Sequence, residues 1–358
     1  MYKGTPVRSS FIHGISLMLL ALFFCSCQSY RTIEIATYNP AIITFPPEIK
    51  TVMIVNNAAQ QPDTSIYQNE SEPTPESLLS LSADSMAYIF CLSLGKAIAE
   101  SPVFDDVRLC EDTIRTDSAF LISRPFTQDD VKKLCNDYNV DALISLDKFY
   151  FKTFSLKWPN NLYSNWSFLT VIVTGELKAL YPGYSTAQTI PFTDSLQWTR
   201  EESIYYREIV AFAEEIQIVM RYFSDYIGEK MNKHFVPYWD DDKRWYYTHI
   251  SSEWKRASAY VIAEKWEEAV GEWRPLFDKV KKWKKKAELA SNLALYYEIK
   301  GDFHKAIEYA EIANSLFITN TDEDDYIRLR QQTYLETLIK RAEDDEILSI
   351  QLRERIGK

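Results

Sequence analysis

Glycine and histidine are scarce in this chain of 358 residues, which contains 9 Gly and 4 His. Phosphate-binding loops need several glycines, because a residue without a side chain lets the backbone approach the anion closely. A nucleotide-binding loop is therefore nearly excluded. The histidines beyond residue 26 are His234, His249 and His304, and none has a partner at metal-ligand spacing. We therefore expect no metal, no cofactor and no catalytic residues.

Basic residues are also in deficit, with 40 Lys and Arg against 51 Asp and Glu, which gives a net charge of −11. Binding to a nucleic-acid backbone depends on clustered Lys and Arg, so no nucleic-acid partner is expected. A dense basic cluster, KKWKKK at residues 281–286, could touch anionic lipid, but the exposed surface of a helical repeat is the favoured interpretation. Hydrophobic residues make up 46% of the chain, which is enough for a core, and the length predicts two or three domains.

The apolar run at residues 11–24 is shorter than the roughly 20 residues of a membrane-spanning helix. It follows Lys3 and Arg8 without any acidic residue, which is the pattern of a secretory signal. The next residues, Phe24-Cys25-Ser26-Cys27, resemble the bacterial lipoprotein signal, although Phe24 stands where Leu is usual. The resemblance implies cleavage after Ser26 and lipidation of Cys27; an ordinary cleaved signal is the alternative.

We therefore expect a lipoprotein signal peptide at residues 1–26 and a lipidated tether at residues 27–50, with the membrane bound through the lipid anchor. The residues after Cys27 lack the acidic run that resembles a surface-export signal in Bacteroidota. This favours an outer-membrane anchor that faces the periplasm. Three cysteines remain in the body of the chain, Cys91, Cys110 and Cys135. Buried small side chains are favoured over a Cys110–Cys135 disulfide.

Residues 51–236 predict an α/β domain with a mixed sheet. Strands are expected at 51–55, 103–110, 139–151, 168–181 and 189–198, helices at 84–101, 127–138 and 204–235, and a long polar loop at 56–84. Residues 127–147, which include the phrase NVDALISLD, resemble the α/β domain of certain bacterial envelope lipoproteins. That resemblance implies a binding or assembly role and no chemistry.

Residues 237–358 predict an all-α domain, with no strand after residue 237. The segment 287–320 resembles the tetratricopeptide repeat, with small residues at the close-contact positions Ala306, Ala310 and Ala313 and a turn at Gly301. Residues 257–273 carry the same order of residue types one repeat earlier. Two further helices are expected at 326–341 and 343–356. The fold class is therefore α+β, an α/β domain with a mixed sheet followed by helices that resemble tetratricopeptide repeats.

Taken whole, the chain resembles an uncharacterised lipoprotein family of Bacteroidota with C-terminal tetratricopeptide-like repeats. We expect a lipid-anchored envelope scaffold, not an enzyme, that binds an envelope protein or peptide on the concave face of the repeats. Tyr260, Asn292 and Tyr296 are the candidate partner-binding residues, chosen by position on the inner helices. The alternative is a cell-wall or glycan-binding protein or hydrolase with carboxylates assembled between the domains.

Overall fold

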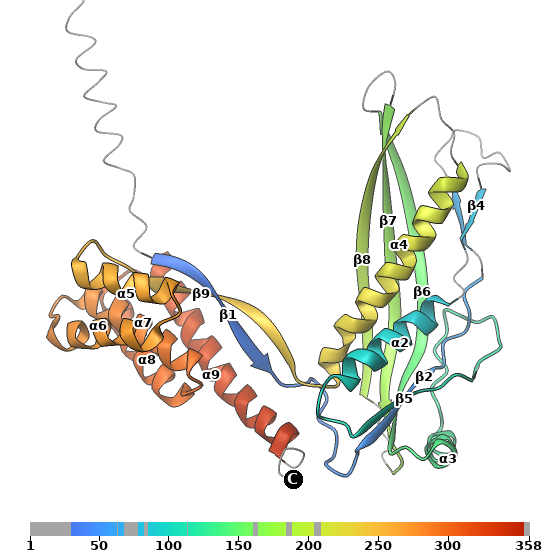
Figure 1. Cartoon of the computed structure of the whole chain (residues 1–358), viewed down its shortest axis with the longest axis horizontal. Coiled ribbons are helices and arrows are strands. Elements are labelled where there is room, and N and C mark those ends of the chain that lie inside the picture. Colours follow the sequence, from blue (N-terminus) through green and yellow to red (C-terminus); the bar gives the residue numbers. More distant parts are fainter. Residues whose placement is uncertain are drawn as a thin grey trace, which may run out of the picture. The chain divides into compact units, whose positions relative to one another are not determined.

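The structure, a computed structural model, describes residues 30–62, 64–67, 78–81, 85–112, 114–159, 164–183, 188–203 and 209–353 (Figure 1). The expected signal peptide and Cys27 lie outside these residues. Two compact units divide the described chain. The sheet unit comprises residues 38–239 and the segment from residue 345 onward, and the helical unit comprises residues up to 37 and 240–344. The division falls within three elements, β1 (Tyr30–Asn39), β9 (Tyr238–Tyr247) and α9 (Tyr326–Arg353).

The sheet unit contains a five-stranded mixed sheet in the order β5-β2-β6-β7-β8. Strand β2 lies between β5 and β6 and is parallel to both, whereas β6, β7 and β8 are antiparallel neighbours. The expected mixed sheet is thus confirmed. The strands are β2 (Thr51–Asn56), β5 (Asp106–Leu109), β6 (Ala142–Pro159), β7 (Ser164–Leu180) and β8 (Gln188–Ser203).

Strand β2 is covered on both faces, because Val52, Met53, Ile54 and Val55 are all fully buried. Val52 and Ile54 join the core formed with α2 (Met86–Ala99) and α4 (Ile209–Lys230). Met53 and Val55 join the core formed with α3 (Gln128–Tyr138) on the other face. A continuous run of apolar residues is what a central parallel strand needs when helices cover both faces.

Local sequence signals explain where α3 begins. The Thr127 hydroxyl accepts a hydrogen bond from the Asp130 backbone N–H at 3.2 Å, and the Asp130 carboxylate accepts one from the Thr127 backbone at 3.0 Å. This reciprocal pair satisfies two N–H groups that the first helical turn leaves without intrahelical partners. The helix ends at Asn139, whose φ of 49° is left-handed.

The expected long loop at 56–84 is wrong in part, because it contains an antiparallel hairpin of β3 (Thr64–Tyr67) and β4 (Leu78–Leu81). Its polar, Pro-rich composition obscured two strands of four residues each. The expected helix at 204–235 is described from Ile209 to Lys230 and continues as a 3-10 turn at Met231–His234.

The helical unit contains two successive helical hairpins. They are formed by α5 (Ser252–Ile262) with α6 (Trp266–Lys279) and by α7 (Trp283–Ile299) with α8 (Phe303–Asn320). Fully buried alanines allow the helices to approach each other closely; these are Ala257, Ala269, Ala294, Ala306, Ala310 and Ala313. Gly301 adopts φ of 73° in the α7–α8 turn, a left-handed conformation that favours glycine. The C-terminal region is therefore helical apart from β9, and the expected α+β class is confirmed.

Three expectations for the helical unit and its flanking segments are wrong. Residues 30–39, which were expected to be part of a tether, form β1, and residues 238–247, where no strand was expected, form β9; the two strands pair with each other. The sequence of β9 contains no β-branched residue and a run of three aspartates, so its composition did not indicate a strand; β9 pairs with β1 and its end packs against the helices. The two expected helices at 326–341 and 343–356 are one continuous helix, α9. No helix in the described part of the chain is both long enough and apolar enough to cross a membrane.

Candidate functional site

The end of strand β9 is enclosed by the helices of the helical unit. Tyr246 and Tyr247 are almost completely buried. The Tyr246 hydroxyl lies 3.1 Å from the Ser258 hydroxyl on α5, and its ring packs against Trp273 on α6 with centroids 6.5 Å apart. The Tyr247 ring faces Phe317 on α8 at 6.5 Å. Neighbouring strand residues point to opposite sides, so β9 contacts both helical hairpins.

The side chain of Asn292 on α7 binds the backbone of this strand. Its Oδ1 accepts a hydrogen bond from the Tyr247 N–H at 2.6 Å, and its Nδ2 donates one to the Tyr247 carbonyl at 2.9 Å. Asn292 is fully buried. Asn292 was expected to contact a partner; in the structure its amide binds the chain's own strand. Position in a repeat identified it as an inward-facing residue, but could not show that β9 fills the space in front of it.

A second buried contact ties β9 to α7 and α9. Glu298 on α7 is fully buried, and its carboxylate accepts hydrogen bonds from Arg244 of β9 at 2.8 and 2.9 Å and from the Tyr334 hydroxyl of α9 at 2.8 Å. Arg341 of α9 also pairs with it, at 2.5 Å. Burial, together with the Glu298 carboxylate, raises the pKa of Tyr334 well above its ordinary value. The cluster therefore supports the fold of the helical unit.

The other two candidate residues are half-buried. Tyr260 lies near the C-terminal end of α5, and Tyr296 lies near the C-terminal end of α7 beneath the Lys300 ammonium group, 5.8 Å from the ring centroid. Beyond Tyr260 the side chain of Ile262 is 67% exposed. Both tyrosines are thus placed where solvent reaches part of the ring, unlike Asn292.

The cysteines of the described chain are free thiols. Cys91, Cys110 and Cys135 are all buried, and Cys110 and Cys135 form no disulfide. Burial raises the pKa of Cys135 to about 11, because the apolar surroundings disfavour the thiolate. Cys27, the expected lipidation site, lies outside the described residues.

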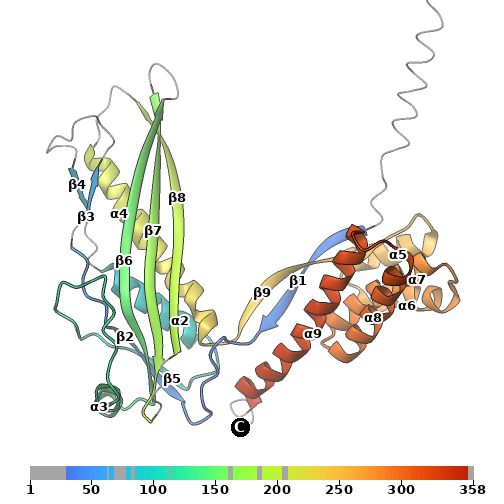
Figure 2. The same cartoon turned by 180° about the vertical axis from the view of Figure 1, so that it is seen from behind.

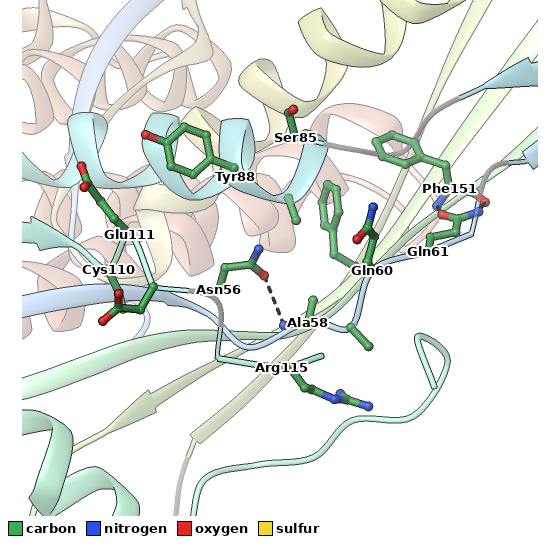
Figure 3. A pocket seen from close by; sticks show the side chains of 14 residues that line it. Asn56, Ala58, Gln60, Gln61, Ser85, Tyr88, Cys110, Glu111, Arg115 and Phe151 are labelled. Atoms are coloured by element: carbon green, nitrogen blue, oxygen red, sulfur yellow. Dashed lines mark hydrogen bonds between the residues drawn. The ribbon is translucent and has the colours of Figure 1, made fainter. Parts of the chain in front are cut away.

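A cleft opens in the sheet unit beyond the carboxyl ends of β2 and β5 (Figure 3). Its volume is about 310 Å³. Ser85 and Tyr88 reach it from the start of α2, Asn56 and Gln60 from the end of β2, and Glu111 from the segment after β5. Ligands of open α/β sheets bind in this position, outside the carboxyl ends of parallel strands where the connections diverge to the two faces.

The walls of the cleft are mixed in character. Apolar surface comes from Ala58, Phe149 and Phe151, and polar groups come from amides, a tyrosine and the two carboxylates of Glu111 and Asp112. Ser85 is left-handed with φ of 69°, and its side chain makes no capping hydrogen bond to α2. Arg115 also lines the cleft. Such walls could hold a polar, largely uncharged ligand such as a sugar.

Arg115 is held by its own loop. Its guanidinium pairs with Asp117 at 2.8 Å and donates to the carbonyl oxygens of Ala119 and Ile122 at 3.0 and 2.9 Å. This guanidinium lowers the pKa of Asp117 well below the usual range. The pairing orders the loop that borders the cleft, so we assign Arg115 a structural role before any role in ligand binding.

A buried polar cluster lies beside the cleft, at a β-bulge in β6. Asp147, the bulged residue, is fully buried and accepts hydrogen bonds from Asn57 at 2.9 Å and Ser145 at 2.5 Å. Lys178 of β7 lies 3.0 Å from Asp147 and 2.9 Å from Glu176. Sequence reasoning did not single out this cluster, although a charged residue inside an otherwise apolar predicted strand was a signal that could have indicated it.

Histidines take no part in a metal site in the described residues. His249 lies 2.6 Å from Glu288, and His234 lies 3.2 Å from the Met231 carbonyl. Groups of three or more His, Cys, Asp or Glu side chains that could hold a metal ion are absent from the residues that the structure describes.

Comparisons with known proteins find two family models that match separate parts of the chain. A family model described as Domain of unknown function (DUF8603) matches residues 49–247, and one described as Domain of unknown function (DUF6340) matches residues 255–340. None of the curated proteins matches the chain significantly.

Solved structures show only a distant likeness. Rare lipoprotein B from Shewanella oneidensis has 9% identity and a TM-score of 0.24, with 51% of this chain and 90% of that chain covered. A minor lipoprotein from Acinetobacter baumannii has 10% identity and a TM-score of 0.26, with 54% and 97% covered. At these scores the likeness does not establish a common fold. The first family model covers more than half of the sequence, and the chain belongs to the family described as Domain of unknown function (DUF8603).

Proposed function

We propose that the chain is a lipid-anchored envelope protein, not an enzyme, whose helical unit is a scaffold for another protein. The lipoprotein-like signal ending at Cys27 supports the anchor. The observation that carries the scaffold is the pair of successive hairpins packed through fully buried alanines, Ala257 and Ala269 in the first and Ala294 and Ala306 in the second. Such tetratricopeptide-like frames present rigid surfaces for peptides and helices.

The proposed binding surface differs from the one that repeat position alone suggests. The space in front of Asn292 contains β9, so a partner binds elsewhere on the hairpins. Tyr260 and Tyr296 remain as candidates because both are half-buried and lie at the C-terminal ends of α5 and α7. Aromatic rings that are already partly ordered lose little conformational freedom on binding, which suits them to an interface.

The proposed location follows the sequence alone. The absence of an acidic run after Cys27 supports an anchor in the outer membrane that faces the periplasm, in an organism related to the Bacteroidota. Replacing Cys27 tests the anchor: Cys27→Ala should move the protein out of the membrane fraction and remove the mass of the acyl chains. A variant that stays in the membrane with an acyl mass shift would refute lipidation at this residue.

In-cell photo-cross-linking tests the scaffold. A photoreactive residue is placed at Tyr260 or Tyr296 of the full-length protein in its native envelope, and at Lys132 on α3 as an exposed control. We expect the same partner protein to be captured from positions 260 and 296 and not from the control position 132. Capture at all three positions, or at none of the three, would argue against this surface.

A second candidate function rests on the cleft beyond β2 and β5. Its amides, its two carboxylates and its tyrosine suit a cell-wall or glycan fragment. Titration of the full mature chain with muropeptides and oligosaccharides, followed by calorimetry, tests this alternative. Binding that Tyr88→Ala and Glu111→Gln weaken, and that the remote Asp129→Asn leaves unchanged, would favour ligand capture over a protein scaffold.

A further inference from the structure

One end of the helical unit carries the start of the described chain. The Tyr30 ring, the first of β1, lies against the guanidinium of Arg330 in the first turns of α9, 4.0 Å from its centroid. Arg330 also lies 5.7 Å from the ring of Tyr247, at the end of β9. Figures 1 and 2 both show the starts of β1 and α9 side by side. We name this part of the molecule the Tyr30 end.

The first turns of α5 and α7 lie at the same end. His249, between β9 and α5, is 2.6 Å from Glu288 near the start of α7, and its ring packs on Trp254 of α5 at 4.5 Å. Trp283, the first residue of α7, packs edge-on against Phe317 near the end of α8 at 5.9 Å. The turns at 248–251, 280–282 and 321–325 therefore belong to the Tyr30 end.

The distance from the proposed lipid anchor to this end is short. Two residues separate Cys27 from Tyr30. Each residue spans at most about 3.6 Å, so the Tyr30 backbone lies within roughly 11 Å of the acylated residue. This step depends on the proposed lipidation of Cys27. A lipid at that residue necessarily brings the Tyr30 end, and not the ends of α5 and α7 that carry Tyr260 and Tyr296, close to the bilayer.

The chemistry of the Tyr30 end suits an anionic bilayer surface. Four exposed lysines, Lys281, Lys282, Lys284 and Lys285, lie at the α6–α7 turn around Trp283. Two side chains with large apolar surface are exposed at the other turns of this end: Ile250 is 84% exposed and Tyr326 is 66% exposed. Basic residues near an anionic membrane attract its headgroups, and exposed aromatic residues suit the headgroup region.

Acidic residues are present at the same end. Asp322, Glu323 and Asp324 are exposed in the α8–α9 turn. Their negative charge opposes binding to an anionic surface and limits the affinity of the unlipidated protein. Removing this charge should therefore increase binding, whereas removing the lysine charge should decrease it.

We propose that the Tyr30 end rests on the anionic phospholipid surface of the membrane to which Cys27 is anchored. The lysines of the α6–α7 turn bind the phosphate groups, and Ile250 and Tyr326 enter the headgroup layer. The partner surface at Tyr260 and Tyr296 then lies at the end of the hairpins that points away from the lipid.

Vesicle flotation tests this orientation with the full mature chain carrying Cys27→Ser, which removes the lipid. Vesicles contain phosphatidylcholine alone or with 30% phosphatidylglycerol, a composition chosen for roughly physiological surface charge. We expect binding to the anionic vesicles only. Replacing Lys281, Lys282, Lys284 and Lys285 by Gln should reduce it about ten-fold or more, because each lysine near the surface contributes. A matched variant, with Lys132, Lys133, Lys265 and Lys340 replaced by Gln, should retain binding within about two-fold, since these exposed lysines lie elsewhere.

Substitutions in the acidic α8–α9 turn should change vesicle binding in the opposite direction. Asp322→Asn, Glu323→Gln and Asp324→Asn combined should increase binding several-fold on the anionic vesicles and leave it unchanged on the neutral ones. Equal losses in the two lysine variants, or no binding of any variant to anionic vesicles, would overturn the proposed orientation.

Mass spectrometry of the protein from its native membrane separates this inference from the proposed anchor. If Cys27 is acylated but vesicle binding does not change when the four lysines are replaced, the proposed anchor is supported and the proposed membrane-facing surface is rejected. Lysine-dependent vesicle binding without acylation of Cys27 would retain the surface and reject the anchor.

Discussion

The carboxamide of Asn292 forms both a donor and an acceptor hydrogen bond with the backbone of Tyr247. A neighbouring antiparallel strand offers the same pair of bonds to a residue opposite it. One side chain of α7 therefore takes the place of a further strand beside β9. This explains how an extended segment of charged and aromatic residues is held among helices without a wider sheet.

Replacing Asn292 should destabilise the helical unit. Asn292→Leu leaves the Tyr247 N–H and carbonyl buried without partners, which should lower the free energy of unfolding by about 3 kcal/mol. Urea denaturation followed by circular dichroism measures the change. Asn320→Ala, at the exposed end of α8, is the control and should change it by less than about 1 kcal/mol. Similar values for the two variants would show that the Asn292–Tyr247 pair contributes little.

The buried carboxylate of Glu298 offers a test of buried against exposed ion pairs. Glu298→Ala removes the partner of Arg244, which is itself buried, and should cost about 3–5 kcal/mol in the free energy of unfolding. Glu267→Ala removes the exposed ion pair with Lys300 and should produce no measurable change. The melting temperatures of the two variants give the comparison. A Glu298→Ala protein that melts like the parent would contradict the assignment of a structural role to this cluster.

The contact between α2 and α4 depends on a glycine. A Cβ at Gly228 of α4 would lie 2.5 Å from the Phe90 carbonyl oxygen and 3.0 Å from the Ser93 Cβ of α2. Gly228→Ala should therefore force the helices apart and destabilise the sheet unit by about 2–3 kcal/mol. Gly271 of α6 has nothing within 4 Å of an added Cβ, so Gly271→Ala should stabilise the helical unit by about 0.5–1 kcal/mol.

Opposite signs for these two substitutions would confirm that space, and not helix propensity, decides the outcome at Gly228. Differential scanning calorimetry is suitable, because the substitutions lie in different units. Stabilisation by both would show that α2 and α4 tolerate a wider separation than the contact distances indicate.

Sequence periodicity predicted most of the sheet unit because its elements satisfy local and tertiary preferences together. The apolar run at Val52–Val55 and the capping pair Thr127 and Asp130 each specify one element without reference to distant residues. Strand β9 was missed for the opposite reason. Its conformation depends on contacts with the helices. One of these contacts, from Asn292 to Tyr247, joins residues that are 45 positions apart in the sequence.

The candidate site was less predictable than the fold. Repeat position correctly marked Asn292 as inward-facing, but the occupant of the inner face came from outside the repeat. The cleft beyond β2 and β5 joins residues from four separate segments, and no spacing in the sequence connects Asn56, Tyr88 and Glu111. Asp147 can be recognised in the sequence as a charged residue in an apolar strand. Its partner Lys178 cannot, because the two residues meet only through the pairing of β6 with β7.

The link between β2 and β6 should make stability depend on pH. Asp141, just before β6, accepts hydrogen bonds from the Lys50 N–H at 2.9 Å and from the Thr51 N–H and hydroxyl, each at 2.8 Å. Burial alone would raise the pKa of Asp141, but these hydrogen bonds outweigh it and lower the pKa below its ordinary value of 3.8. The folded protein therefore binds the proton less readily than the unfolded chain does.

This difference fixes the sign of the dependence on pH. The contribution of Asp141 to stability is fully present above the unfolded value, near pH 4, and is lost as the pH falls through the lower folded value. Asp141→Asn should therefore be less stable than the parent at pH 7 and should lose less stability as the pH falls below the unfolded value and through the lower folded value. Urea denaturation at several pH values measures the two slopes. Asp137→Asn, on the exposed surface of α3, is the control and should follow the parent. Parallel slopes for Asp141→Asn and the parent would show that this carboxylate is not the group that responds to acid.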